Sequence, residues 1–265
     1  MTDAGSYSVT YTGFYDTESR PVHGVVPMEE EITLYVNIQP LVRLMCTPTL
    51  LEELALGFLF NEGLIESLDE VAVVERCGTG RGVDVWLTHD VEAPQLRTIT
   101  SGCSGGTTFE AMNGEHHRIE SNLHITPQRV AMLMDKLFDA AVLYHRSGGV
   151  HTAALASGEQ LICVAEDVGR HNTLDKITGV GLRQGWPMQE HVLLTTGRVS
   201  SEMINKAARM GIPIVISRTS PTSLSVQLAQ AWGITLIGYT RRRSFHVYAG
   251  EERVVAQTAN DGELR

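Results

Sequence analysis

Cysteine is scarce in this chain of 265 residues, and the cysteines that occur are scattered. Cys46, Cys77, Cys103 and Cys163 lack the paired spacing of a structural zinc site, and they are too few for a disulfide-stapled scaffold. Sparse use of cysteine suits a reducing compartment. We therefore expect a cytoplasmic protein without a structural metal.

Long apolar runs and an excess of positive charge are also missing. No stretch approaches the roughly 20 apolar residues that a transmembrane helix needs, and residues 1–15 lack the apolar run of a signal peptide. Lys and Arg number 21 against 31 Asp and Glu, for a formal net charge of -10. Such a protein repels nucleic acid and anionic membranes, so we expect neither as a partner. An anionic ligand would have to be held by local arginines.

The first half of the chain indicates an α+β arrangement. Residues 1–30 predict an irregular or edge-strand lead-in, because Pro21 and Pro27 interrupt regular structure. Residues 31–38 alternate like a half-buried strand, and 71–74 and 83–87 predict two more strands around a Gly-rich turn. A helix is expected between the strand at 31–38 and the strand at 71–74, with Thr49 and Glu52 as a capping box and Gly63 at its C-terminal end.

The second half alternates between apolar strands and amphipathic helices. Thr126 and Pro127 start a long helix that is expected to end before Gly148. Strands are expected at 161–165, 191–195, 212–217 and 234–239, with helices at 200–210 and about 222–232. This pattern predicts an α/β fold whose mostly parallel sheet has helices on its faces. We place a domain boundary near residue 125, giving domains 1–125 and 126–265.

Arginines follow the ends of these strands. Ligands of parallel sheets collect at the carboxyl ends of the strands, and helix N-termini there favour anions. A phosphate-bearing ligand is one interpretation, and structural salt bridges with Glu166 and Asp167 are the other. Neither a G-x-x-x-x-G-K-[ST] loop nor a G-x-G-x-x-G turn is present. The candidate ligand-binding residues are Arg198, Arg218, Tyr239, Thr240, Arg241, Arg242, Arg243 and Ser244.

Cys103 lies between glycines and small hydroxyl residues in the segment 100–107. Glycines allow a tight turn whose N–H groups can stabilise a thiolate, the reactive form of cysteine. A tight turn around an inert cysteine is the simpler alternative. His151 could act as a base toward Cys103 in a cysteine hydrolase, and Glu166, Asp167 and His171 could bind a divalent metal. A capped core histidine and an ion-pair network with Arg170 and Lys176 are the corresponding structural alternatives.

The segment from Glu166 to Asn172 reads E-D-V-G-R-H-N, and Asp175 and Lys176 follow it. It resembles the signature E-D-V-G-R-H-x-x-x-D-K of the formate dehydrogenase accessory sulfurtransferase (FdhD/NarQ) family. Further similar segments are 56–58 with 62–63, the 102–103 loop, 149–154, 200–208, 221–224 and 236–239. The resemblance covers nearly the whole chain from about residue 28.

This resemblance implies a cytidine-deaminase-like second domain and a typically dimeric protein. It implies that Cys103 receives sulfur from a cysteine desulfurase as a persulfide and passes it to the molybdenum cofactor of formate dehydrogenase. The bis-guanine-dinucleotide form of that cofactor would be held by the segment from Tyr239 to Ser244, and its phosphates would meet the arginine-lined edge.

Two positions depart from the family pattern. Many members have a C-x-x-C loop, whereas Gly106 takes the second cysteine position here, so Cys103 would act alone. The segment 241–244 lacks the Pro-Gly-Arg ending of some relatives. A chaperone that only holds the cofactor is one rival. A deaminase-type zinc hydrolase is another, but His151 is not followed by the required glutamate and no P-C-x-x-C is present.

Overall fold

The computed structural model describes residues 5–78, 80–90, 97–99, 118–242 and 244–255. The strands are β1 Ser6–Tyr15, β2 Glu18–Pro27, β3 Glu30–Val36, β4 Gln39–Cys46, β5 Val71–Arg76, β6 Gly82–Leu87, β7 Arg97–Ile99, β8 His151–Ser157, β9 Gln160–Asp167, β10 Val192–Thr195, β11 Ile214–Ser217, β12 Thr235–Arg241 and β13 Ser244–Ala249. The helices are α1 Leu51–Asn61, α2 Pro127–Asp139, α3 Val142–Ser147, α4 Arg170–Gln184, α5 Ser201–Arg209 and α6 Ser223–Trp232.

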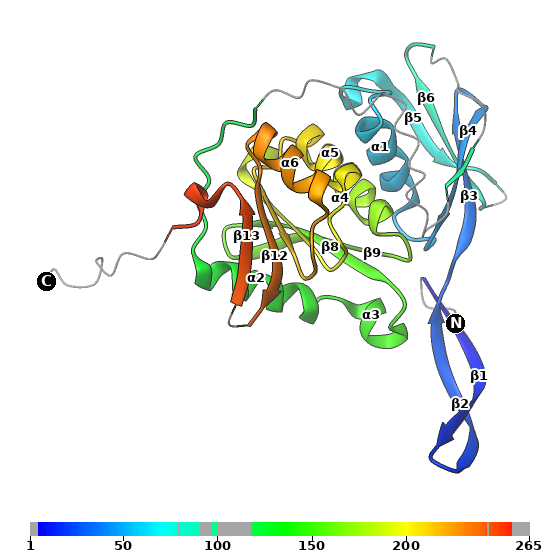
Figure 1. Ribbon diagram of the computed structural model, residues 1–265. Coiled ribbons are helices and arrows are strands. Elements are labelled where there is room, and N and C mark those ends of the chain that lie inside the picture. The colour runs from blue at the N-terminus through cyan, green and yellow to red at the C-terminus, as the bar shows by residue number, and fades with distance from the viewer. Residues whose placement is uncertain (1–4, 79, 91–96, 100–117, 243, 256–265) are drawn as a thin grey trace, which may run out of the picture.

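Strands β1 and β2 form a hairpin that extends away from the rest of the molecule (Figure 1). Of the two alternatives for this lead-in, the edge strand is confirmed and the irregular segment is wrong. Pro21 pairs with Thr12 inside a continuous ten-residue ladder. Each strand of a two-stranded hairpin has an open edge, so a proline that donates no hydrogen bond can be accommodated there.

The N-terminal sheet has the order β5-β6-β3-β4-β7, and α1 packs on it. The predicted helix is confirmed, but its capping box is wrong: α1 starts after Leu50, which has a left-handed backbone (φ 51) and no side-chain cap. The Thr49 hydroxyl instead accepts a hydrogen bond from Lys176 Nζ at 3.1 Å. Gly63 follows the helix with φ 75, as a C-terminal glycine should.

Helix α1 connects this sheet to the rest of the protein by lying directly against α4 (Figure 1). A Cβ at Gly57 would lie 1.8 Å from the Asp175 carbonyl oxygen, and one at Gly179 would lie 1.9 Å from the Glu53 carbonyl oxygen. The two helix backbones therefore touch at positions that only glycine can occupy.

The C-terminal sheet has the order β13-β12-β11-β10-β8-β9. Strands β10, β11 and β12 are parallel, whereas β8, β9 and β13 pair antiparallel to their neighbours. The predicted α/β class is confirmed, but the sheet is mixed, and its parallel part is limited to the three central strands. The hairpin partner β8 was not predicted.

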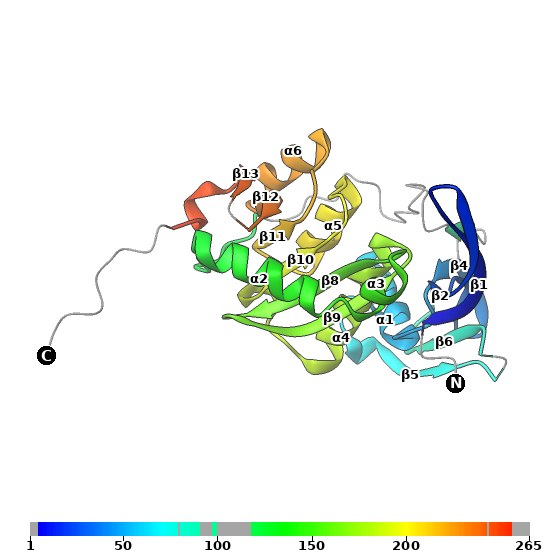
Figure 2. The same cartoon turned by 90° about the horizontal axis from the view of Figure 1, so that it is seen from below.

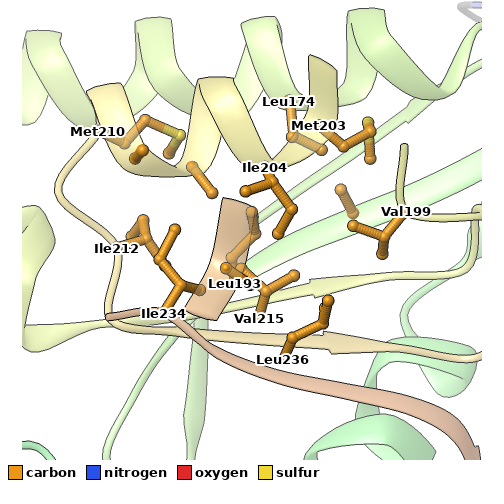
Figure 3. Packing of buried hydrophobic residues seen from close by; sticks show 14 of the residues in the cluster. Leu174, Leu193, Val199, Met203, Ile204, Met210, Ile212, Val215, Ile234 and Leu236 are labelled. Atoms are coloured by element: carbon orange, nitrogen blue, oxygen red, sulfur yellow. The ribbon is translucent and has the colours of Figure 1, made fainter. Parts of the chain in front are cut away.

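Helices cover both faces of this sheet. Helix α2 lies along one face, as the view from below shows (Figure 2). It packs there through Val130, Leu133 and Leu137. Helices α4, α5 and α6 cover the other face. There Met203 and Ile204 of α5 lie over Leu193, Val215 and Leu236 of the three parallel strands (Figure 3).

The helix expected to continue to Gly148 is broken between α2 and α3. Thr126 caps α2 by accepting a hydrogen bond from the Arg129 N–H at 3.2 Å, as predicted. The break follows at Ala140, because the Glu166 carboxylate accepts hydrogen bonds from the N–H groups of Leu143 and Tyr144 at 2.7 and 2.9 Å. This carboxylate serves as the cap of α3.

None of the helices in the described ranges is both long and apolar enough to cross a membrane. The two larger sheets lie on either side of residue 125 in the sequence. The domain boundary at that residue stays a prediction.

Candidate functional site

The carboxyl ends of the three parallel strands meet at one edge of the C-terminal sheet. The Arg218 N–H donates to the Thr195 carbonyl oxygen at 3.0 Å, and the Tyr239 N–H donates to the Thr219 carbonyl oxygen at 3.0 Å. Because β8 runs antiparallel to β10, its first residue, His151, lies at the same edge. The predicted convergence of these strand ends is therefore observed.

A cavity of about 540 Å³ lies at this edge, between α2 and the end of β12. This volume falls in the range of small-molecule sites. Arginines from two strand ends line it, together with acidic and aromatic residues of α2. Its lining residues are Met134, Asp135, Phe138, Asp139, Arg218, Thr240, Arg241 and Arg242.

Arg218 is held in the cavity by one hydrogen bond and one ring contact. Its Nη1 donates to the Thr240 carbonyl oxygen at 3.0 Å, and its guanidinium lies 5.5 Å from the centre of the Phe138 ring. The Arg241 guanidinium in turn donates to the Arg218 carbonyl oxygen at 3.4 Å. An arginine anchored by one N–H keeps its other donors available, and it can offer them to an anion at little further entropic cost.

Thr240 has a hydroxyl that is buried and has no hydrogen-bond partner among the described residues. A buried polar group without a partner is costly, and it commonly marks a position completed by water or a ligand. The preceding residue, Tyr239, has a left-handed backbone (φ 50) and an exposed side chain. A non-glycine residue held at positive φ is typical of functional sites.

Acidic side chains line the opposite wall of the cavity. Arg242 lies 4.0 Å from Asp135, in a contact that leaves 88% of the arginine side chain exposed. Asp135 and Asp139 were missed from the sequence, as was Phe138. The signal for them was the polar face of an amphipathic helix, which by itself does not identify the strand ends that the helix covers.

The structure does not bring every predicted residue into this cavity. Tyr239 and Ser244 flank its arginines along the chain, and Ser244 pairs with Arg241 where β12 turns into β13. Arg198 is exposed on the loop after β10 and is not among the described residues that line the cavity. Its charge contributes to lowering the pKa of the Arg170 guanidinium. Arg243 and Cys103 lie outside the described residues.

The signature segment forms buried ion pairs that join the two halves of the molecule. Lys176 Nζ lies 2.7 Å from the Asp167 carboxylate and also donates to the Thr47 carbonyl oxygen at 2.9 Å. Lys206 Nζ donates to the Asp175 carboxylate at 2.6 and 2.7 Å, and the Asn61 amide of α1 donates to the same carboxylate at 2.8 Å. These contacts favour the ion-pair interpretation of Asp167 and Lys176.

No group of three or more His, Cys, Asp or Glu side chains is positioned to hold a metal ion in the part of the chain that the structure describes. Asp167 is paired with Lys176, and Glu166 caps α3. His171 lies 3.0 Å from the Glu202 carboxylate. The segment 100–117, which contains Cys103 and the adjacent histidines His116 and His117, lies outside the described residues, so the expected absence of a structural metal stays a prediction.

The other cysteines are poor candidates for thiolate chemistry. Burial is the main cause that raises the pKa of Cys46 to about 12, and it raises the pKa of Cys163 to about 12 as well. Burial also raises the pKa of Cys77. Because the thiolate is the nucleophile, these thiols are largely inert near neutral pH.

Comparison with known proteins agrees with this architecture. The model of the FdhD/NarQ family matches residues 27–255. Sulfur carrier protein FdhD of Bacillus licheniformis is 38% identical over 234 residues, which cover 85% of this chain and 88% of that protein. Sulfur carrier protein FdhD of Listeria innocua is 35% identical over 242 residues, covering 88% and 92%.

A solved structure is similar over nearly its whole length. It is the crystal structure of a protein from Desulfotalea psychrophila assigned as a formate dehydrogenase accessory protein. It has a TM-score of 0.82 and 28% sequence identity, and the match covers 94% of this chain and 99% of that one. With a family match across most of its length and relatives above 30% identity, the chain belongs to the FdhD/NarQ family.

Proposed function

We propose that this protein is a sulfur carrier that serves formate dehydrogenase by transferring sulfur to its molybdenum cofactor. The names of its relatives, sulfur carrier protein FdhD, support the general role. Cys103 is the carrier in this proposal, because burial disfavours the thiolate at Cys46 and Cys163. The donor is a cysteine desulfurase, and the acceptor is the bis-guanine-dinucleotide form of the cofactor, which is the substrate.

The first step is an exchange between sulfur atoms. The Cys103 thiolate attacks the terminal sulfur of the desulfurase persulfide, so one S–S bond forms, another breaks, and the desulfurase leaves as a thiolate. In the second step the Cys103–sulfur bond breaks, and Cys103 keeps its electron pair as a thiolate. The transferred sulfur atom takes an electron pair from molybdenum and becomes a sulfido ligand.

The observation that carries the cofactor part of the proposal is the arginine-lined cavity at the end of β12. Arg218, Arg241 and Arg242 offer donors that suit phosphate groups. Asp135 and Asp139 on the facing helix offer acceptors for the ring and amino N–H groups of guanine. Donors for phosphate and acceptors for a base within one cavity are what a guanine nucleotide requires.

A chaperone that only holds the cofactor is the rival that the lone cysteine of the 100–107 loop keeps open. Mass spectrometry separates the two functions. The full chain would be incubated with a cysteine desulfurase and cysteine and then digested without reductant. Sulfur transfer predicts that the Cys103 peptide gains the mass of one sulfur atom, whereas a chaperone would leave Cys103 unmodified.

A further inference from the structure

A second cluster of basic side chains lies at the same sheet edge, outside the cavity. His151 begins β8, Arg170 begins α4, and Arg198 lies between β10 and α5. Arg170 and His151 both lie next to Gly197. A Cβ at this glycine would lie 3.0 Å from Arg170 Cβ and 3.5 Å from His151 Nδ1. Because Gly197 has no side chain, the arginine and the histidine can approach each other.

Arg170 is the unusual member of this cluster. Its side chain is buried at 8% exposure, and its Nε has no hydrogen-bond partner within the ranges that the structure describes. Burial, and after it the charge of Arg198, lower the pKa of the Arg170 guanidinium. A buried guanidinium beside a second arginine lacks the compensation that buried charges normally require.

The nearby acidic groups do not fully supply that compensation. Glu202 attracts Arg170, but its carboxylate is bound at 3.0 Å by His171. Asp167 is paired with Lys176 at 2.7 Å. Among the described residues, the groups that face one another here are thus two arginines, the histidines His151 and His171, and the Glu202 carboxylate.

Two helix N-termini add to the positive potential. Helix α4 begins after Gly169 and α5 begins after Ser200, and neither has a side-chain cap. The Ser200 hydroxyl lies 3.2 Å from His171 Nε2 instead. Free N–H groups at helix N-termini bind anions. Uncapped helix ends, a buried arginine whose Nε has no partner among the described residues, and an exposed arginine therefore lie together at this edge.

We propose that His151, Arg170 and Arg198, with the N-termini of α4 and α5, form a second anion site that takes a phosphate group. The site is distinct from the cavity at Arg218, because none of these three side chains is among the described residues that line it. Neighbouring strands lie about 4.8 Å apart, and β8 is three strands from β12. A ligand with two nucleotide arms can reach both sites, and this choice of ligand rests on the proposed function.

His151 reports directly on this site. Burial first, and then the charges of Arg170 and His171, lower the pKa of this imidazole below its ordinary value of 6.5. A bound phosphate brings negative charge next to the imidazole and raises that pKa. The test is an NMR titration of the His151 ring in the full chain against pH, with and without inorganic phosphate.

We expect phosphate to raise the His151 pKa with saturation, and Arg198→Ala to weaken this binding by about tenfold or more. Arg183→Ala is the matched control, since that arginine pairs with Glu52 and Glu53 away from this sheet edge and its loss should leave the response of His151 to phosphate unchanged. An unmoved His151 pKa in the wild type, or equal weakening by both variants, would overturn the proposal.

GDP identifies the source of the phosphate group. A second equivalent of GDP that raises the His151 pKa assigns the site to a nucleotide phosphate. A response to inorganic phosphate alone assigns it to the free ion, and both results uphold the site. The proposed cofactor cavity is tested separately, by the effect of Arg218→Ala on the binding of the first equivalent of GDP. Either site can therefore be disproved without affecting the other.

Discussion

At the scale of single residues, the chemistry divides between one thiol and a few arginines. The thiol differs from the other cysteines by its setting. Cys103 lies in a Gly-rich segment of the sequence, whereas Cys46 is fully buried and Cys163 is partly buried. Burial that holds a cysteine pKa near 12 leaves too little thiolate for sulfur exchange.

We predict that Cys103→Ala abolishes the activation of formate dehydrogenase while the protein stays folded. The reason is that no other thiolate takes over the persulfide. Activity of a formate dehydrogenase produced together with each variant is the measurement, and circular dichroism checks folding. Cys163→Ala is the control and should retain activation. Full activation by Cys103→Ala would disprove the carrier role.

The cavity arginines lead to a second prediction. GDP should bind as a substitute for one arm of the cofactor, and Arg218→Ala and Arg241→Ala should each weaken binding by about 1.5–3 kcal/mol if they contact phosphate. Calorimetric titration of GDP measures this loss. Arg183→Ala is a suitable control, because that arginine pairs with Glu52 and Glu53 away from the cavity. Unchanged affinity in both cavity variants would place the nucleotide elsewhere.

His151 predicts a pH dependence of stability. Its pKa in the folded protein lies below 6.5, so the unfolded chain binds more protons between these two values. The free energy of unfolding should therefore fall as the pH is lowered through about 6.5. Urea unfolding of the wild type and of His151→Gln across this window measures the effect. An equally steep fall in the variant would assign the dependence to another group.

At the scale of elements, the contact between α1 and α4 makes the two larger sheets one structure. Gly179→Ala would gain about 1 kcal/mol of helix propensity. It would also force a methyl group into the Glu53 carbonyl, which lies 1.9 Å from the Cβ position. Overpacking of this kind costs about 3 kcal/mol or more. We predict net destabilisation by at least about 2 kcal/mol in chemical denaturation.

Gly78→Ala is the matched control for that substitution. A Cβ at Gly78 would meet no described atom within 4 Å, and its φ is not positive. Its unfolding free energy should therefore stay within about 0.5 kcal/mol of the wild type. If Gly179→Ala were equally harmless, the close backbone contact between the two helices would not exist in solution.

Elements that depend on local patterns could be predicted from the sequence, and those that depend on distant partners could not. Thr126 and Pro127 predicted the start of α2 because capping involves only adjacent residues. Thr49 does not cap α1, because its hydroxyl accepts a hydrogen bond from Lys176, which is distant in the sequence. The Ala-rich strand β8 was missed because small residues give little alternation between apolar and polar.

The same distinction applies to the residues of the candidate site. Arg218, Arg241 and Arg242 could be predicted because strand ends of a parallel sheet converge wherever the helices lie. Asp135 and Asp139 could not, because the position of α2 over the sheet is set by its packing on β8, β10 and β12. Arg198 was assigned to the same ligand as Arg218, although the structure groups it with Arg170.

At the scale of the whole molecule, a net charge of -10 opposes the binding of an anionic nucleotide. The acidic residues that give this charge lie throughout the sequence, whereas the arginines of the cavity would lie within contact distance of a phosphate. At an ionic strength of 0.1 M the Debye length is about 10 Å, and salt screens both the repulsion by distant acidic residues and the attraction by the cavity arginines. The repulsion by distant residues is already weak at that ionic strength. The loss of local attraction should therefore dominate as salt increases.

We predict that GDP binding weakens as sodium chloride is raised from about 0.05 to 0.5 M, over which the Debye length falls well below 10 Å. Calorimetric titrations at several salt concentrations provide the slope. Arg218→Ala should show a shallower slope than the wild type, because it has one fewer attractive charge to screen. Affinity that rises with salt would mean that the repulsion of the whole molecule outweighs the arginines, and the cavity would then not be a phosphate site.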